Sequence, residues 1–235
     1  MFTHKSEIIQ LTVLSKSRKS NNYCVAGLDQ NNNLVRLISD DISINNAIEI
    51  ARFSYENGDP IELGDVIEVE VYEKNQLDEL QPENRLVKEY TFRNIGTVSF
   101  LNLMLRATPL IDYPFYNDEY YVSHEELIEH IHHDIYSLML VHANTLTLRV
   151  NESENHNKAL VGSFYFGLGT EEGQRWCNYY RITDMAFIDK YYDKVKESTK
   201  GSITIRNVVL TLSLGEEYFG NHYKLIAAVF ENDKR

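Results

Sequence analysis

A group of cations and hydroxyls stands directly after the first apolar segment of the chain. Residues 15–19 read Ser-Lys-Ser-Arg-Lys, and a further arginine lies on the third apolar segment. Serine hydroxyls beside fixed cations at a strand end can hold a phosphate or a carboxylate, which an arginine can bind through two parallel hydrogen bonds. The first candidate anion site comprises Ser17, Arg18, Lys19 and Arg36. The alternative is a solvated basic turn whose arginines pair with Asp65 or Glu83.

A compact polar group lies between two later strand-like segments and consists of Gln81, Glu83 and Asn84. Amide and carboxylate groups in such an arrangement can read a base edge or a sugar through paired hydrogen bonds. The same residue types also satisfy backbone groups at turns. Both interpretations stay open, and the group is kept as part of the candidate nucleic-acid or phosphate site.

A second candidate anion site lies in the C-terminal half. Tyr180, Arg181 and Lys224 would bring one hydroxyl and two cations together if their two segments are neighbouring strands. Directly after the first of these segments, Thr183 and Asp184 are best explained as the N-cap of a following helix.

The histidines are a weaker candidate for chemistry. His124, His130, His132 and His133 lie in one segment with acidic residues, and pairs spaced i,i+4 on a helix could ligate a divalent metal. The HExxH order of zinc proteases is absent, so we expect an ordinary polar helix face, no metal and no other cofactor. No Ser-His-Asp, Cys-His or phosphate-loop arrangement occurs either. We therefore expect a binding protein and not an enzyme, and rank a metal-dependent hydrolase last.

The charge of the chain limits its partners. The formal net charge is −12, from 23 basic and 35 acidic residues. An acidic protein is repelled by a long polyanion, which argues against wrapping of DNA but permits a nucleotide, a strand end or another protein. Residues 1–36 nevertheless have a local balance of +3, from Lys5, Lys16, Arg18, Lys19 and Arg36 against Glu7 and Asp29.

Other features of the sequence indicate a cytoplasmic protein without membrane association. No apolar run approaches the length of a membrane span, and the first residues lack the pattern of a signal peptide. Cys24 and Cys177 are far apart and have no further ligand at zinc spacing, so they are expected to be free thiols in a reducing compartment.

Most of the chain shows the period-two alternation of β-strands. Ile67, Val69 and Val71 share one face of a segment whose other face is polar, which is typical of a half-buried antiparallel strand. Strands are predicted over residues 7–14, 22–28, 33–39, 64–73 and 85–92, and again over 145–150, 158–168, 174–183, 202–214 and 222–230. Short helices are predicted over 99–106 and 184–196.

The strongest helical pattern lies between the two sets of strands. Ser123 and Glu126 form a capping box, and apolar residues then recur at helical spacing as far as Met139. The predicted fold is mainly β with a few helices: two small five-stranded β-barrels joined by a connector helix. The predicted domains are an N-terminal barrel over 1–120, the connector helix over 121–143 and a C-terminal barrel over 144–235.

Several short motifs occur in a family-like order. They are LTVLSKSRKSNNYCVAG, LVRLIS, GDVIEVEV and LQPEN in the N-terminal half, and YYRITD, LSLGE and YKLIAAVFE in the C-terminal half. Together they resemble the dual OB-containing domain family of bacterial proteins over nearly the whole chain. The chain departs from the family pattern at Val35, Leu37 and Leu80, where the family has an aromatic residue, a proline and a histidine.

The resemblance implies two OB folds and a nucleic-acid-binding or nucleotide-binding role in prokaryotic conflict and defence systems. We expect a non-catalytic module that recognises a nucleotide or the end of a short single strand, with the phosphate on Arg18, Lys19 and Arg36. With Val35 in place of the family's aromatic residue, a base-stacking platform is not expected there. The alternative function is a protein–protein adaptor that uses the acidic surface and the 16 tyrosines.

Overall fold

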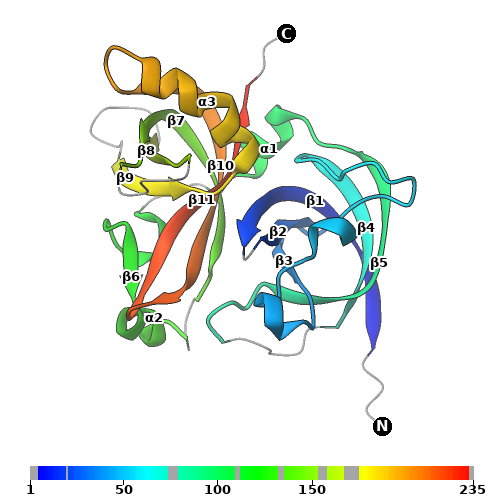
Figure 1. Ribbon diagram of the computed structural model, residues 1–235. Helices are drawn as coiled ribbons and strands as arrows, with labels where there is room; N and C mark the ends of the chain where they lie inside the picture. The colour runs from blue at the N-terminus through cyan, green and yellow to red at the C-terminus, as the bar shows by residue number, and fades with distance from the viewer. Residues whose placement is uncertain are drawn as a thin grey trace. The chain divides into compact units, whose positions relative to one another are not determined.

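The structure is a computed structural model that describes residues 5–19, 21–73, 79–108, 112–131, 135–152, 158–166 and 175–232. The chain divides into two compact units, Met1–Ser99 and Phe100–Arg235. Each unit is built mainly from strands, with short helices beside them (Figure 1). The mainly β fold class predicted from the sequence is therefore confirmed.

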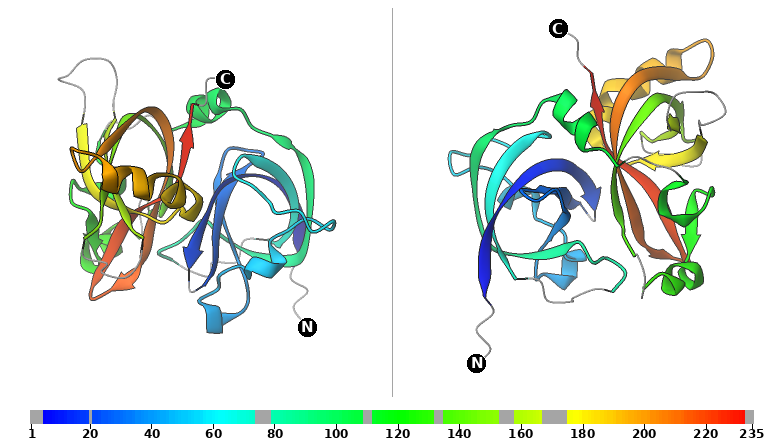
Figure 2. Two further views of the ribbon diagram at one scale, coloured as in Figure 1. Left: turned by 45° about the horizontal axis from the view of Figure 1, so that its top comes forward. Right: turned by 180° about the vertical axis from the view of Figure 1, so that it is seen from behind.

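The strands of the first unit form a closed barrel. Its elements are β1 (Ser6–Lys19), β2 (Asn22–Asp29), β3 (Leu34–Ile38), the 3₁₀ turns η1 (Ile42–Ile44) and η2 (Ile50–Arg52), β4 (Asp65–Tyr72) and β5 (Asn84–Thr97). The strands pair in the ring order β1-β2-β3-β5-β4, and the ring closes between β4 and β1 (Figure 2). Every pair is antiparallel except β3 with β5, which is parallel. All five strands predicted for this half are present.

The interior of the first barrel is apolar. Ile67, Val69 and Val71 on β4 are all fully buried, as the alternation of this strand predicts. They pack in one cluster with inward residues of the other strands, and the rings of Phe53 and Phe92 meet edge to face at 5.2 Å within it. This cluster keeps the barrel rigid enough to hold polar residues at its rim.

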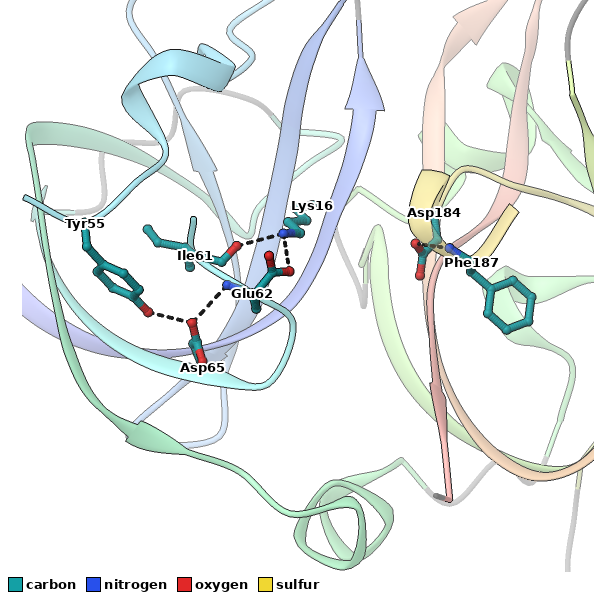
Figure 3. A network of polar contacts seen from close by, with 7 residues as sticks. All are labelled: Lys16, Tyr55, Ile61, Glu62, Asp65, Asp184 and Phe187. Carbon is teal, nitrogen blue, oxygen red and sulfur yellow. Dashed lines mark hydrogen bonds and ion pairs between the residues drawn. The ribbon is translucent and has the colours of Figure 1, made fainter. Parts of the chain in front are cut away.

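Lys16 from the basic segment is part of the barrel's own structure. Its ammonium donates to the carbonyl oxygen of Ile61 at 2.8 Å and to the carboxylate of Glu62 at 2.5 Å (Figure 3). Nearby, the Asp65 carboxylate accepts hydrogen bonds from the Tyr55 hydroxyl at 2.6 Å and from the backbone of Glu62 at 2.9 Å. These bonds tie β1 to the segment before β4, so Lys16 serves the barrel and not an external anion.

The second unit forms a ring of the same kind. Its elements are α1 (Phe100–Arg106), η3 (Pro114–Tyr116), β6 (Tyr121–Ser123), α2 (His124–Glu129), β7 (Leu138–Val150), β8 (Leu160–Phe166), β9 (Arg175–Ile182), α3 (Met185–Glu197), β10 (Ile203–Tyr218) and β11 (Asn221–Glu231). The sheet runs β10-β7-β8-β9-β11, and an additional pairing of β10 with β11 closes these five strands. The short β6 adds to the edge of β11.

Both rings use one pairing scheme. In each, the first strand pairs with the second and fourth, and the third strand runs parallel to the fifth, which for the second unit is β9 with β11. The units differ in the link between the third and fourth strands, which is two 3₁₀ turns in the first unit and α3 in the second. Asp184 caps α3 by accepting a hydrogen bond from the backbone of Phe187 at 3.0 Å (Figure 3), so the predicted N-cap is confirmed.

The connector helix predicted over 121–143 is wrong. Ser123 does cap a helix, but α2 ends at Glu129, and β7 begins at Leu138. The residues from Leu138 to Val141 are all buried, and a strand buried on both faces has a continuous apolar run that periodicity does not separate from a helix. The division of the chain also falls earlier than predicted, because residues 100–120 belong to the second unit.

Two further features concern the cysteines and the lengths of the helices. Cys24 is half-buried and Cys177 is buried, and neither forms a disulfide. The longest helix described is α3, with 13 residues, and no helix in the described ranges combines the length and apolar character needed to cross a membrane.

Candidate nucleic-acid interface

OB folds bind oligonucleotides on the face of their second and third strands and with the loops after their first and fourth strands. In the first unit these elements are β2, β3, the turn after β1 and the segment before β5. The first candidate site lies on or directly beside them: Ser17, Arg18, Lys19, Arg36, Gln81, Glu83 and Asn84. The location fits an interface, so the contacts of each side chain decide what it can bind.

Arg18 is the most accessible cation of this set. It lies at the end of β1 opposite Tyr23, and its side chain is exposed. One guanidinium nitrogen donates to the amide oxygen of Asn21 at 2.7 Å, across the turn to β2. Among the described residues Arg18 forms no ion pair, which leaves most of its five N–H donors for solvent or a ligand. Ser17 beside it is buried, opposite Cys24.

Arg36 does not join Arg18. It pairs with Ala26 on β2, whereas Arg18 pairs with Tyr23, three residues away on the same strand. Because successive side chains of a strand alternate between faces, positions three apart lie on opposite faces. Arg36 is also buried, with 3% of its surface exposed, and donates to the amide oxygen of Asn84 at 3.1 Å. The structure therefore separates the two arginines that the sequence suggested would share one phosphate.

The polar group before β5 is tied to Arg36. The carbonyl oxygen of Glu83 accepts from the backbone N–H of Arg36 at 2.9 Å, where β5 starts beside β3. The side-chain amide of Asn84 donates to the amide oxygen of Gln81 at 3.3 Å. The side chains of Arg36, Asn84 and Gln81 thus form a hydrogen-bonded chain. The structure favours the interpretation that this group stabilises a turn over the interpretation that it reads a base or a sugar.

Val35 points into the barrel and belongs to its apolar cluster. A side chain buried in the core offers no surface for stacking a base, which agrees with the expectation for this position.

The second candidate site does not assemble on the surface. Tyr180 and Lys224 are buried in the second barrel, at 0% and 1% exposure, whereas Arg181 is exposed and points away from them. The ammonium of Lys224 donates to the backbone and side-chain oxygens of Asn117 at 2.6 and 2.8 Å. The Asn117 amide in turn donates to the Glu126 carboxylate at 2.9 Å. The three predicted residues therefore do not converge on an open anion site.

Burial dominates the proton affinities in this interior. It lowers the pKa of Lys224 to about 8 and raises the pKa of Cys177 to about 12. Burial also raises the pKa of the Tyr180 hydroxyl. In each of these three titratable groups, burial in the second barrel shifts the pKa toward the uncharged form.

A surface hollow that the sequence analysis missed lies on the second barrel. Its volume is about 820 Å³, and its lining includes Tyr120, Arg149, Asn151, Val161, Tyr179 and Lys196. Arg149 and Val161 are register partners on β7 and β8. They lie outside the ring, because their neighbours Leu148 and Leu160 are fully buried. The hollow therefore covers outer faces of the first, second and third strands, which include the OB-fold binding face.

The hollow combines two cations and one carboxylate, Glu152, with exposed rings. Arg149 and Lys196 are exposed, and within the described part of the chain neither forms an ion pair. Tyr179 is 53% exposed and has a left-handed φ of 61°, beside an irregularity in the pairing of β8 with β9. Further along the same two strands, the rings of Tyr165 and Trp176 lie 4.2 Å apart. In the sequence, this face is indicated by the outward position of Arg149 in the predicted strand 145–150. No motif marks that position.

The predicted histidine helix is only partly described. His130 follows α2 and stacks on Tyr116, with ring centroids 3.7 Å apart. His132, His133 and Asp134 lie outside the described residues.

Comparison with known proteins relates these observations to a family. No curated protein and no solved structure matches the chain. A model of the dual OB-containing domain matches residues 9–229, a span that includes both rings and the segment between them. The repeated pairing scheme, with its parallel third and fifth strands, is the structural counterpart of two OB folds in one chain. The chain belongs to the dual OB-containing domain family.

Proposed function

We propose that this protein is a non-catalytic module that binds a nucleotide or a short single strand of nucleic acid in the hollow of its second unit. The observation that carries the proposal is the combination of Arg149 on β7 and Lys196 on α3 with the exposed ring of Tyr179 on β9. β9 is the third strand of its ring and belongs to the face that OB folds use for oligonucleotides. Membership of the dual OB-containing family supports a binding role of this kind.

The side chains of the hollow suit the parts of a nucleotide. Arg149 can bind a phosphate through two N–H donors, and Lys196 can add a point charge. Stacking of a base on an aromatic ring such as Tyr179 contributes about 1–3 kcal/mol per base and tolerates any base. The expected specificity is therefore for phosphate and an unpaired base, with little preference among sequences.

The footprint on the ligand is small. A volume of about 820 Å³ fits a small ligand. The net charge of −12 opposes binding of a long polyanion. We expect about one to three phosphate contacts, so affinity should fall by about 0.7 log units per log of salt for each contact on a single strand.

The first unit offers a candidate phosphate contact of its own, Arg18. Its guanidinium is exposed and has donors to spare after its bond to Asn21. Arg18→Ala should weaken only the binding of an oligonucleotide to the first unit and lower the salt slope of that binding by about 0.7. Arg36, in contrast, is hydrogen-bonded to Asn84 at the start of β5. Arg36→Ala should therefore lower the stability of the first barrel and not its affinity for a ligand.

A binding titration tests the proposal. Labelled mononucleotides and short oligothymidylates are titrated into the wild type, Arg149→Ala and Tyr179→Ala at two salt concentrations, with anisotropy as the readout. Loss of the charged hydrogen bonds of Arg149 should cost about 1.5–3 kcal/mol, and loss of the Tyr179 ring about 1–3 kcal/mol. Arg206→Ala, which removes the same charge from an exposed position on β10, is the matched control and should bind like the wild type.

Two outcomes would contradict the proposal. One is a wild type that binds none of these probes, and the other is Arg149→Ala and Tyr179→Ala variants that bind as tightly as Arg206→Ala. The adaptor function would then take its place. Tyr218 and Phe219, 63% and 85% exposed at the turn between β10 and β11, offer an aromatic surface for a protein partner.

A further inference from the structure

Three side chains that can ligate a metal meet where the hairpin of β10 and β11 passes the start of α2 (Figure 1). His124 is the first residue of α2, Glu217 lies on β10 and His222 on β11. Nδ1 of His124 is 3.2 Å from Nε2 of His222 and 3.5 Å from a carboxylate oxygen of Glu217. The three ligand atoms all lie within 4.8 Å of one another. None of these residues lines the hollow described above.

The backbone holds the three elements together without help from the side chains. β6 pairs with the start of β11, with Val122 opposite His222. The N–H of His124 donates to the carbonyl of Gly220 in the hairpin turn at 2.9 Å. An irregularity in the pairing of β10 with β11 lies between Leu214 and Glu217. The cluster is therefore preorganised by main-chain hydrogen bonds.

His222 has the orientation of a metal-binding histidine. It is 5% exposed, and its Nδ1 donates to the carbonyl oxygen of Gly215 at 3.0 Å. A neutral imidazole that donates from Nδ1 carries its lone pair on Nε2, and this is the atom that faces His124. Metal-binding histidines are commonly oriented in this way, with the second ring nitrogen donating to a carbonyl or carboxylate. Without a metal, the same lone pair accepts a hydrogen bond from Nδ1 of His124.

The spacing of the ligand atoms fits a tetrahedral ion. Zinc binds histidine nitrogen and carboxylate oxygen at about 2.0–2.2 Å, which puts neighbouring corners of a tetrahedron about 3.4 Å apart. The separations of 3.2 and 3.5 Å around Nδ1 of His124 lie on either side of this value. The third separation, between Glu217 and His222, lies within the 4.8 Å that spans all three ligand atoms.

We propose that His124, Glu217 and His222 form a binding site for one zinc-like divalent transition-metal ion. Two imidazoles and one carboxylate supply three ligands, and the fourth position stays open to water or to an external ligand. Two nitrogen ligands select against calcium and magnesium, which prefer oxygen ligands. The ion fastens the hairpin of β10 and β11 to the start of α2, and so stabilises the second unit through mass action.

The experiment uses the full chain without a histidine tag, stripped with a chelator and titrated calorimetrically with zinc chloride. We expect one ion per chain, and no comparable binding of magnesium. Replacement of outer-shell partners already weakens metal sites by about 10–100-fold, so loss of a ligand in Glu217→Gln or His124→Ala should weaken affinity at least tenfold. Glu125→Gln makes the same charge change at an exposed neighbour and should keep wild-type affinity.

His222→Ala is left out because loss of a buried ring can unfold the hairpin. The absorption spectrum of the Co²⁺ form provides a second readout, since tetrahedral coordination gives a visible band that both ligand variants should lose. A wild type that binds no zinc would overturn the proposal and leave only a hydrogen bond between two histidines. Zinc binding of equal affinity in the wild type, Glu217→Gln and His124→Ala would also overturn it, because the ion would then lie elsewhere.

Discussion

The two barrels share one pairing scheme but enclose different interiors. The first is filled with apolar residues and keeps Lys16 at the rim, with 19% of the side chain exposed. The second encloses Cys177, Tyr180 and Lys224, all of them buried. The same strand order thus accepts either an apolar or a partly polar filling. The alternation of apolar and polar residues along the strands therefore determines the fold. A few polar residues that face into or out of each barrel determine what that barrel can bind.

The largest expected difference in the free energy of unfolding is between the variants Lys224→Ala and Lys16→Ala. Lys224→Ala removes the donor to both oxygens of Asn117 and leaves a cavity inside the second barrel, at a cost of about 3–5 kcal/mol. Lys16→Ala, the matched change in the first barrel, removes a side chain that still reaches solvent and should cost about 1 kcal/mol.

The single tryptophan makes this comparison measurable. Trp176 lies on β9, so its fluorescence during urea unfolding reports on the second unit. Lys224→Ala should move this transition to lower urea concentration, and Lys16→Ala should leave it in place. An unshifted transition in Lys224→Ala would mean that the buried lysine does not stabilise the second barrel.

A second contrast concerns one glycine in the second strand of each barrel. A Cβ on Gly27 of β2 would lie 2.2 Å from the backbone oxygen of Thr12, which cannot move without disturbing β1. A Cβ on Gly162 of β8 would meet the ends of the Ile226 and Leu146 side chains, at 2.6 and 2.8 Å, and these can rotate. Gly27→Ala should therefore cost about 3 kcal/mol and Gly162→Ala about 1–2 kcal/mol. Hydrogen exchange of the amides in each ring measures both costs. A larger cost for Gly162→Ala than for Gly27→Ala would contradict the prediction from these contact distances.

The buried thiol should make the second barrel sensitive to alkali. Burial raises the pKa of Cys177 from its ordinary value of 9.0 to about 12. The unfolded chain therefore loses this proton first, and the stability that the thiol contributes is complete below pH 9 and is lost as the pH rises toward 12. Lys224, whose pKa is lowered to about 8, acts in the opposite direction between pH 8 and its ordinary 10.5.

Cys177→Ala should reduce the alkaline loss, although the buried Tyr180 hydroxyl, whose pKa is also raised, keeps part of it. The gain from Lys224 should remain. The Trp176 transition of this variant should fall less steeply above pH 9 than that of the wild type, at equal ionic strength. Cys24→Ala, which removes the half-buried thiol of the first barrel, is the matched control and should follow the wild type. Parallel curves for all three proteins would show that the buried thiol does not govern the pH dependence.

The smallest effect concerns the link between the third and fourth strands. Asp184 caps the 13-residue α3, and Asp184→Ala should cost about 1 kcal/mol of stability together with some helical circular dichroism. Asp41 caps the three-residue η1 by accepting from the backbone of Ser43 at 2.8 Å. Asp41→Ala should leave the circular dichroism unchanged, because so short a turn contributes little to it. Equal losses of signal would argue that the caps are equivalent.

The strands were the part most open to prediction from sequence. All ten predicted strands are present, because alternation survives wherever one face of a strand is buried and the other is not. β7 was partly missed for the opposite reason, since its start is buried on both faces. Lys224 shares the inward face of β11 with Ile226, two residues along, so the parity of the strand already put it in the core. The rarity of buried lysines hid that position.

The sites were less predictable, because they depend on which strands become neighbours. The separation of Arg18 from Arg36 follows from their partners on β2, and nothing within their own strands encodes it. The hollow depends on the outward face of Arg149 and on residues from distant segments. Glu217 and His222 are partners across the hairpin of β10 and β11, but His124 joins them through the pairing of β6 with β11, which no sequence spacing indicates.

The parallel pair of the third and fifth strands also sets an order of events during synthesis. A ring of this kind cannot close before its fifth strand exists, and that strand ends at Thr97 in the first barrel and at Glu231 in the second. As a nascent chain lengthens, the first barrel can close while the second still lacks its last strand. Until then β9 and β10 have open edges, and incomplete sheets of this kind are prone to aggregate. The period of greatest risk in the life of the chain is therefore the interval between completion of β10 and completion of β11.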